Sequence, residues 1–240
     1  MHFSSSVFIA ALVGIAQAQT PEGFKPSVNT KLDVMFNSTA VKTPGELLSK
    51  QTTSTQPRIA ISRNAVNSTE TFVFVMLDLD VPPAQGNTTR RVLLHAMNTG
   101  FKASQQRMAN GTVLLTSSET GPAAYLPPGP PATDTKAHRY VELLFAQPAN
   151  LQVQASDFAN TQARIGFDIV SFGQKNGLGA PLAANFFTVD GRAGASASGT
   201  ATASGGIARN TLQPFEGAAG HMDMSFGLAG LLGGLAIVAV

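Results

Sequence analysis

The residues of this chain that are best suited to do chemistry lie in two short stretches. The first leads from a pair of aspartates past a proline to a histidine, and the second leads from a tyrosine through a proline-rich loop to another histidine. In chain order these residues are Asp78, Asp80, Pro82 and His95, then Tyr125, Pro128, Pro131, His138, Arg139 and Tyr140. Each stretch adjoins an apolar run of strand length, residues 72–77 and 141–145. We therefore expect these side chains where buried strands reach surface turns, which is where binding sites tend to lie.

The side-chain types suit the binding of an anion. Imidazoles and an arginine can hold an anion, and imidazole also takes up or releases a proton near neutral pH. Proline fixes φ and removes a backbone donor, so the two proline clusters predict stiff walls and a cis X–Pro bond in one of the turns. Arg139 is expected to pair with an acid such as Asp80 beneath the site.

Each of these residues also has a structural interpretation. Asp78 and Asp80 could cap a turn, and His95, within an apolar strand, could be a buried histidine bonded to a backbone carbonyl. Tyr125 and Tyr140 could be core aromatics. Taken one at a time, the residue types leave both interpretations open.

Taken together, the motifs resemble those of the phosphatidylethanolamine-binding proteins, a family that includes the Raf kinase inhibitor proteins, plant flowering regulators and a yeast carboxypeptidase inhibitor. Residues 78–82, D-L-D-V-P, are similar to the family's D-P-D-x-P segment, and His95 stands at the histidine of its H-W pair. Residues 125–141 are similar to its Y-x-x-P-x-P-P-x-G-x-H-R-Y-V segment, and residues 179–187 to its closing G-x-P-V-A-G-N-F-F. The resemblance extends from about Val28 to Val189. Ala96 departs from it, because the family usually has tryptophan at that position.

The resemblance implies both a fold and a site. The fold is mainly β, a central sheet or sandwich of largely antiparallel strands with a few short helices, the main one near the C-terminal end of the domain. The site is a pocket for a small phosphoryl or carboxylate anion, such as a phospholipid head group. The implied ligand-binding residues are Asp78, His95, Tyr125, His138 and Tyr140, and the implied pocket-shaping residues are Asp80, Pro82, Pro128, Pro131 and Arg139.

Two further functions stay open. The carboxypeptidase inhibitor in the family suggests a protease partner held by surface loops, and the Asp/His group suggests a hydrolase. Against catalysis, the chain has no cysteine and no G-x-S-x-G nucleophile motif. Two histidines and a carboxylate on distant loops are a weak basis for a zinc site, so we expect no metal and no cofactor. The formal net charge of +2, with no basic platform of aromatic residues, argues against a nucleic-acid partner.

Alternating and apolar runs separated by Gly, Pro and Asn turns predict strands through the body of the chain. The expected strands are 58–62, 71–77, 91–98, 112–115 and 140–147. Helical signals come late: Ser156 and Asp157 could cap a short turn, and residues 167–175 form the one longer helix, which Gly177 ends. A last extended segment through residues 185–187 returns to the main sheet, as the resemblance implies.

The two ends of the chain carry processing signals. Residues 1–18 are expected to be a signal peptide, with an apolar centre and a small-residue cleavage site at Ala18. The binding domain would follow at 19–191, then a flexible Ser/Ala/Gly-rich tether at 192–217. Residues 218–240 read as a glycosylphosphatidylinositol attachment signal that is removed, with attachment at Gly217 or, as an alternative, at Asn210. A transmembrane anchor is the weaker interpretation of that tail.

These signals predict a secreted protein held at the extracellular face of the plasma membrane or in the cell wall. Export makes the N-x-S/T sequons at Asn37, Asn67, Asn87 and Asn110 candidate glycosylation sites. The sequon at Asn87 would place a glycan near the mouth of the expected pocket.

Overall fold

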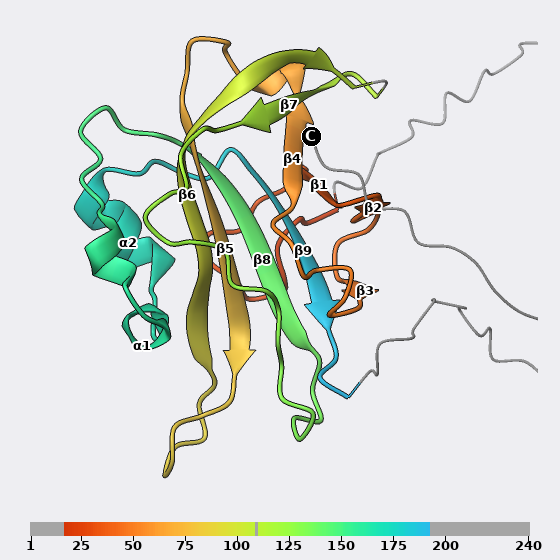
Figure 1. Cartoon of the computed structure of the whole chain (residues 1–240), viewed down its shortest axis with the longest axis vertical. Helices are drawn as coiled ribbons and strands as arrows, with labels where there is room; N and C mark the ends of the chain where they lie inside the picture. The colour runs from red at the N-terminus through yellow and green to blue at the C-terminus, as the bar shows by residue number, and fades with distance from the viewer. Residues whose placement is uncertain (1–16, 109, 193–240) are drawn as a thin grey trace, which may run out of the picture. The chain divides into compact units, whose positions relative to one another are not determined.

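The computed structural model describes residues 17–108 and 110–192, in which nine strands join into one sheet (Figure 1). The strand order is β2-β1-β4-β7-β6-β5-β8-β9-β3, with β3 and β9 parallel and the other pairs antiparallel. The strands are β1 (Asp33–Phe36), β2 (Thr39–Ala40), β3 (Glu46–Leu48), β4 (Arg58–Ser62), β5 (Phe72–Val81), β6 (Arg91–Arg107), β7 (Thr112–Thr116), β8 (His138–Ala146) and β9 (Ala183–Val189). The fold is mainly β, as expected.

The long strand β6 belongs to two parts of this sheet. Its first part, Arg91 to Phe101, pairs with β5, and its last part, from Lys102, pairs with β7. The central part of the sheet therefore contains β3, β9, β8, β5 and β6, and the smaller part contains β2, β1, β4, β7 and the end of β6. One hydrophobic cluster includes side chains from both parts, so the two parts pack face to face.

The other face of the central part is covered by the short helices (Figure 1). They are η2 (Ala155–Phe158), α1 (Thr161–Arg164) and α2 (Ile169–Asn176), whereas η1 (Arg63–Ala65) follows β4. Because β5 is buried on both faces, Val73 and Val75 pack toward the helices while Phe72 and Phe74 pack toward the smaller part. This explains why its sequence is a continuous apolar run.

The longer helix begins two residues later than the sequence pattern suggests. The Asp168 carboxylate accepts hydrogen bonds from the backbone N–H groups of Val170 and Ser171, which makes Asp168 the N-cap. Gly177, at φ 69°, ends the helix in the left-handed conformation. The expected turn at residues 156–157 is η2.

The expected strands are confirmed, and β9 pairs with β8 as implied. Strands β1, β2 and β3 were not predicted, because two to four residues are too few to show a periodicity.

The predicted position of a cis X–Pro bond is wrong. Among the described residues the cis bond is Lys25–Pro26, which lies outside both proline-rich turns. No helix within residues 17–108 or 110–192 has the length and apolar character to cross a membrane. The predicted tether beyond Arg192, the anchor signal and most of the signal peptide lie outside the described residues.

Candidate functional site

A β-bulge in β6 directs His95 into the interior between the two parts of the sheet. Met76 of β5 pairs with Ala96, but the next residue, Leu77, pairs with Leu94, so His95 is the extra residue of the bulge. The His95 ring lies edge-on to the Tyr140 ring, with centroids 5.1 Å apart. Its Nδ1 lies 2.7 Å from the Leu126 carbonyl oxygen. Because a carbonyl only accepts, Nδ1 donates and carries the proton of the neutral ring.

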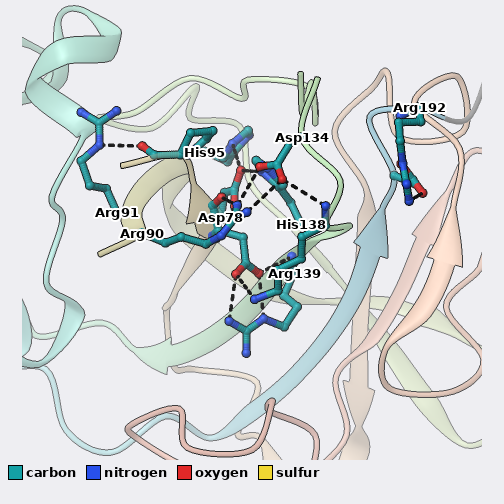
Figure 2. A network of polar contacts seen from close by, with 12 residues as sticks. Asp78, Arg90, Arg91, His95, Asp134, His138, Arg139 and Arg192 are labelled. Atoms are coloured by element: carbon teal, nitrogen blue, oxygen red, sulfur yellow. Dashed lines mark hydrogen bonds and ion pairs between the residues drawn. The ribbon is translucent and has the colours of Figure 1, made fainter. Parts of the chain in front are cut away.

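The other ring nitrogen of His95 faces a carboxylate. His95 Nε2 is buried, has no hydrogen-bond partner among the described residues, and lies 3.9 Å from Asp78 Oδ2. The same Asp78 oxygen lies 2.8 Å from His138 Nδ1 (Figure 2). Asp78 therefore stands between the two imidazoles and orients His138, while His95 Nε2 is left with an unused hydrogen-bonding position.

His138 is held by carboxylates at both ring nitrogens. Its Nε2 lies 3.0 Å from Asp134 Oδ2, and Asp134 is in turn bound by both terminal nitrogens of Arg90, at 2.7 and 2.8 Å (Figure 2). The carboxylates of Asp78 and Asp134 accept from both ring nitrogens, an arrangement that favours the imidazolium form.

The two imidazoles are consequently tuned in opposite directions. Burial lowers the pKa of His95 and outweighs the opposing effect of its bond to Leu126. Burial also acts to lower the pKa of His138, but the hydrogen bonds to Asp78 and Asp134 outweigh it and the pKa is raised. The site thus favours the charged form of His138 and the neutral form of His95, whose free Nε2 then presents a lone pair.

Asp80 forms a second charged cluster beneath the first. Its buried carboxylate accepts from Arg139 Nε at 2.7 Å, Arg139 Nη2 at 3.0 Å, the Arg139 backbone N–H at 3.0 Å and Lys136 Nζ at 2.7 Å. Although burial acts to raise it, the bonds to Arg139 and Lys136 lower the pKa of Asp80 to about 2. The expected pairing of Arg139 with Asp80 is confirmed, and the pair ties β5 to β8.

The two tyrosines differ in their surroundings. Tyr140 is fully buried, stacks on Phe187 at a centroid distance of 5.3 Å, and follows His138 on the same face of β8. Tyr125 is partly buried, and its hydroxyl donates to the Thr53 carbonyl oxygen at 2.7 Å. Burial raises the pKa of both phenols. The structure thus brings Tyr140 beside the imidazoles, while the hydrogen bond of Tyr125 is made to another loop.

A protein-family model that matches most of the folded domain identifies the family of this chain. The family model described as phosphatidylethanolamine-binding protein matches residues 37–187, which include both charged clusters. The chain belongs to the phosphatidylethanolamine-binding protein family.

The chain is also similar to individual proteins and solved structures. Phomoidride biosynthesis cluster protein N of Talaromyces stipitatus is 36% identical over 198 residues, which cover 76% of this chain and 96% of that protein. The 26 kDa secreted antigen of Toxocara canis is 28% identical over 166 residues, 65% of this chain and 55% of that protein. Among solved structures, the carboxypeptidase Y inhibitor in complex with its cognate proteinase is similar at a TM-score of 0.51 and 21% identity, covering 68% of this chain and 84% of that chain. At that identity the likeness supports the fold alone.

In this phosphatidylethanolamine-binding family member, the structure gathers most of the residues singled out in the sequence. Asp78, His95, His138 and Tyr140 meet at one place, and Pro82 contributes its carbonyl oxygen to Arg91 Nε at 3.0 Å. Pro128 is buried and Pro131 is exposed in the loop before β8. The four sequon asparagines are all exposed, and their glycosylation stays a prediction.

Sequence reasoning missed three residues of the site. Asp134 and Arg90 form the outer end of the chain of contacts, and the only sequence signal for Asp134 is its spacing four residues before His138. Glu142, also on the Tyr140 face of β8, is fully buried, and neither of its oxygens has a hydrogen-bond partner in the described part of the chain. Burial raises the pKa of Glu142 well above the ordinary value, so the side chain is a neutral acid.

Proposed function

We propose that this chain is a binding protein whose Asp78, His95 and His138 group accepts a small anion, such as a phosphoryl head group. His138 supplies a positive charge held in place by Asp78. His95 supplies a second nitrogen that accepts a hydrogen bond when neutral and donates one when protonated. No nucleophile is required, so the proposal is binding without turnover.

The observation that carries the proposal is the unused Nε2 of His95. A buried polar atom without a partner costs free energy, so sites of this kind are filled by a ligand or by water when the protein is in solution. His95 Nε2 faces the Asp78 carboxylate, which also bonds His138 Nδ1, so a group bound at this nitrogen would lie next to the Asp78–His138 pair. Membership of this family supports the same reading.

Anion affinity is expected to rise as the pH falls. The pKa of His95 is lowered by burial, so its imidazole gains positive charge only below the ordinary histidine range, whereas the carboxylates beside His138 raise the pKa of that imidazole. Titration calorimetry of wild-type protein with inorganic phosphate and with phosphorylethanolamine, at about pH 5.5 and about pH 7.5, measures this dependence.

The control for this titration is a His95→Ala, His138→Ala double variant, which should lose the binding heat. A variant of an exposed residue outside the site, Lys102→Ala, should retain it. Heat that is unchanged in the double variant, or absent from wild-type protein at both pH values, contradicts the proposal.

Inhibition of a protease is the second candidate, favoured by the structural similarity to an inhibitor of carboxypeptidase Y. Such an inhibitor would use surface loops or its N-terminal segment from Gln19. Inhibition of a carboxypeptidase that survives in the His95→Ala, His138→Ala variant would favour this function over anion binding.

The proposal includes export and a glycosylphosphatidylinositol anchor, as the two ends of the sequence suggest. A distant relative is named a secreted antigen. Release of the protein from intact cells by a phosphatidylinositol-specific phospholipase C is the expected result for an anchored chain.

A further inference from the structure

Asp134 occupies a cradle of four hydrogen-bond donors. Its Oδ2 accepts from Arg90 Nη1 at 2.7 Å and lies 3.0 Å from His138 Nε2. Its Oδ1 accepts from Arg90 Nη2 at 2.8 Å and from the Lys136 backbone N–H at 3.0 Å. Two of these donors belong to the Arg90 guanidinium and one to the His138 imidazole, and such a set is typical of a phosphoryl or carboxylate site.

These donors are the ones that an incoming anion would need. His138 has no other free nitrogen, because Nδ1 is taken by Asp78. Arg90 directs both terminal nitrogens at Asp134 (Figure 2). The outer part of the proposed site is thus already filled by a carboxylate of the chain itself, and the Asp134 side chain is only 6% exposed.

The loop that carries Asp134 allows this carboxylate to leave. Its neighbours Thr133 and Thr135 are exposed, and Asp134 follows the last proline of the rigid wall by three residues. Rotation of the Asp134 side chain toward solvent would uncover Arg90 and His138.

We propose that Asp134 is an internal anion of this site, which a ligand must displace, and that a phosphoryl group is able to do so whereas a carboxylate is not. The inference rests on the proposed function. It places Asp134 as the residue that determines which anions enter.

The expected selectivity follows because an external carboxylate and the Asp134 carboxylate compete for the same donors with the same kind of group. An external carboxylate offers the same two oxygens as Asp134 but must also be held from free solution, whereas the internal carboxylate acts at an effective concentration on the order of millimolar or above. Near neutral pH a phosphoryl group carries more negative charge than a carboxylate and brings a third acceptor oxygen, which strengthens its hydrogen bonds to Arg90 and His138.

The test compares Asp134→Asn and Asp134→Ser with wild-type protein, using phosphate, phosphorylethanolamine and acetate in separate titrations. If the Asp134 carboxylate leaves the donors free about a tenth of the time in wild-type protein, its removal should tighten phosphate binding by about tenfold. Acetate should bind the variants and fail to bind wild-type protein. Asp190→Asn is the matched control, because Asp190 also pairs with an arginine, Arg192, but makes no hydrogen bond or ion pair with His138 among the described residues. It should leave all three affinities unchanged.

A second readout does not need a ligand. The pKa of the His138 imidazole, followed by NMR, should fall in Asp134→Asn and not in Asp190→Asn, since only the first removes a negative charge beside Nε2. An unchanged pKa, or phosphate affinity equal to or weaker than that of wild type, overturns the internal-anion proposal while the proposed function stands. Absence of phosphate binding in wild-type protein overturns the proposed function. It also overturns this inference, even where the variants bind, because the inference requires phosphate to displace Asp134 from the wild-type site.

Discussion

Glu142 is the least satisfied polar side chain of the site. It lies on β8 between the pairing partners Met76 and Asn185, is fully buried, and has no hydrogen-bond partner among the described residues. A buried polar group of this kind destabilises the folded state by about 1–3 kcal/mol. Its neighbours on this face of β8, Tyr140 and Leu144, belong to a hydrophobic cluster.

Replacing Glu142 with methionine should raise the free energy of unfolding by about 1–3 kcal/mol, because the unpaired carboxyl is removed at similar volume. The difference in the free energy of unfolding between Glu142→Gln and wild type should depend on pH. The raised pKa keeps the folded carboxyl protonated while the unfolded one ionises above 4.5, so wild-type stability falls as the pH rises above that value. The stability of the glutamine variant lacks this dependence, so the difference between the two should grow from acid to neutral pH in urea unfolding.

A difference between Glu142→Gln and wild type that is constant over this pH range would show that the carboxyl has a partner in solution.

At the residue scale, the sequence could predict the buried Asp78, His95 and His138 but not the Asp134–Arg90 pair. Asp78, His95 and His138 stand in recognisable motifs, and the structure brings them together. Asp134 and Arg90 come from separate loops, and their contact depends on how the loop before β8 folds over the loop before β6, which no local spacing encodes. The unpaired state of Glu142 is likewise a property of the packed sheet.

The element that positions His95 is a loop that lies along β6. Met97 and Ala123 exchange two backbone hydrogen bonds, at 2.9 and 3.1 Å, and the Leu126 N–H donates to the His95 carbonyl oxygen at 2.8 Å. The loop therefore carries the Leu126 carbonyl that fixes the tautomer of His95. Gly121 allows this close approach, because a Cβ there would lie 2.4 Å from the Met97 carbonyl oxygen.

Gly121→Ala should destabilise the protein by at least about 2 kcal/mol more than Gly86→Ala. Both glycines have positive φ, 73° and 81°, so both variants carry the same kind of backbone strain. Only the first also collides with β6, since nothing lies within 4 Å of the position of a Cβ at Gly86. Chemical denaturation of the two variants measures the difference, and equal losses of stability would mean that the loop is not held against β6.

At the element scale, strands that are buried on two faces were predictable from their continuous apolar runs. The exact start of α2 required the Asp168 cap, and the bulge at His95 required the pairing of β6 with β5. Neither feature has a periodic signature in the sequence.

At the scale of the whole domain, the central part of the sheet is covered by helices on one face and by the smaller part of the sheet on the other. The hydrophobic clusters on both faces hold β5, β6 and β8 in register. The Asp/His group belongs to the face between the two parts, where His95 and Tyr140 meet. The fold thus buries Asp78, His95 and His138, whereas the Arg90 side chain at the outer end is 28% exposed.

The most direct test of the account is a crystal structure of the wild-type domain at saturating phosphate. We expect a phosphate within hydrogen-bonding distance of His138 Nε2 and Arg90, with the Asp134 side chain turned toward solvent. His95 Nε2 should be directed at the anion or at a water that bridges to it. A structure in which the Asp134 carboxylate keeps its contacts with His138 and Arg90, with no anion at this site, would contradict it.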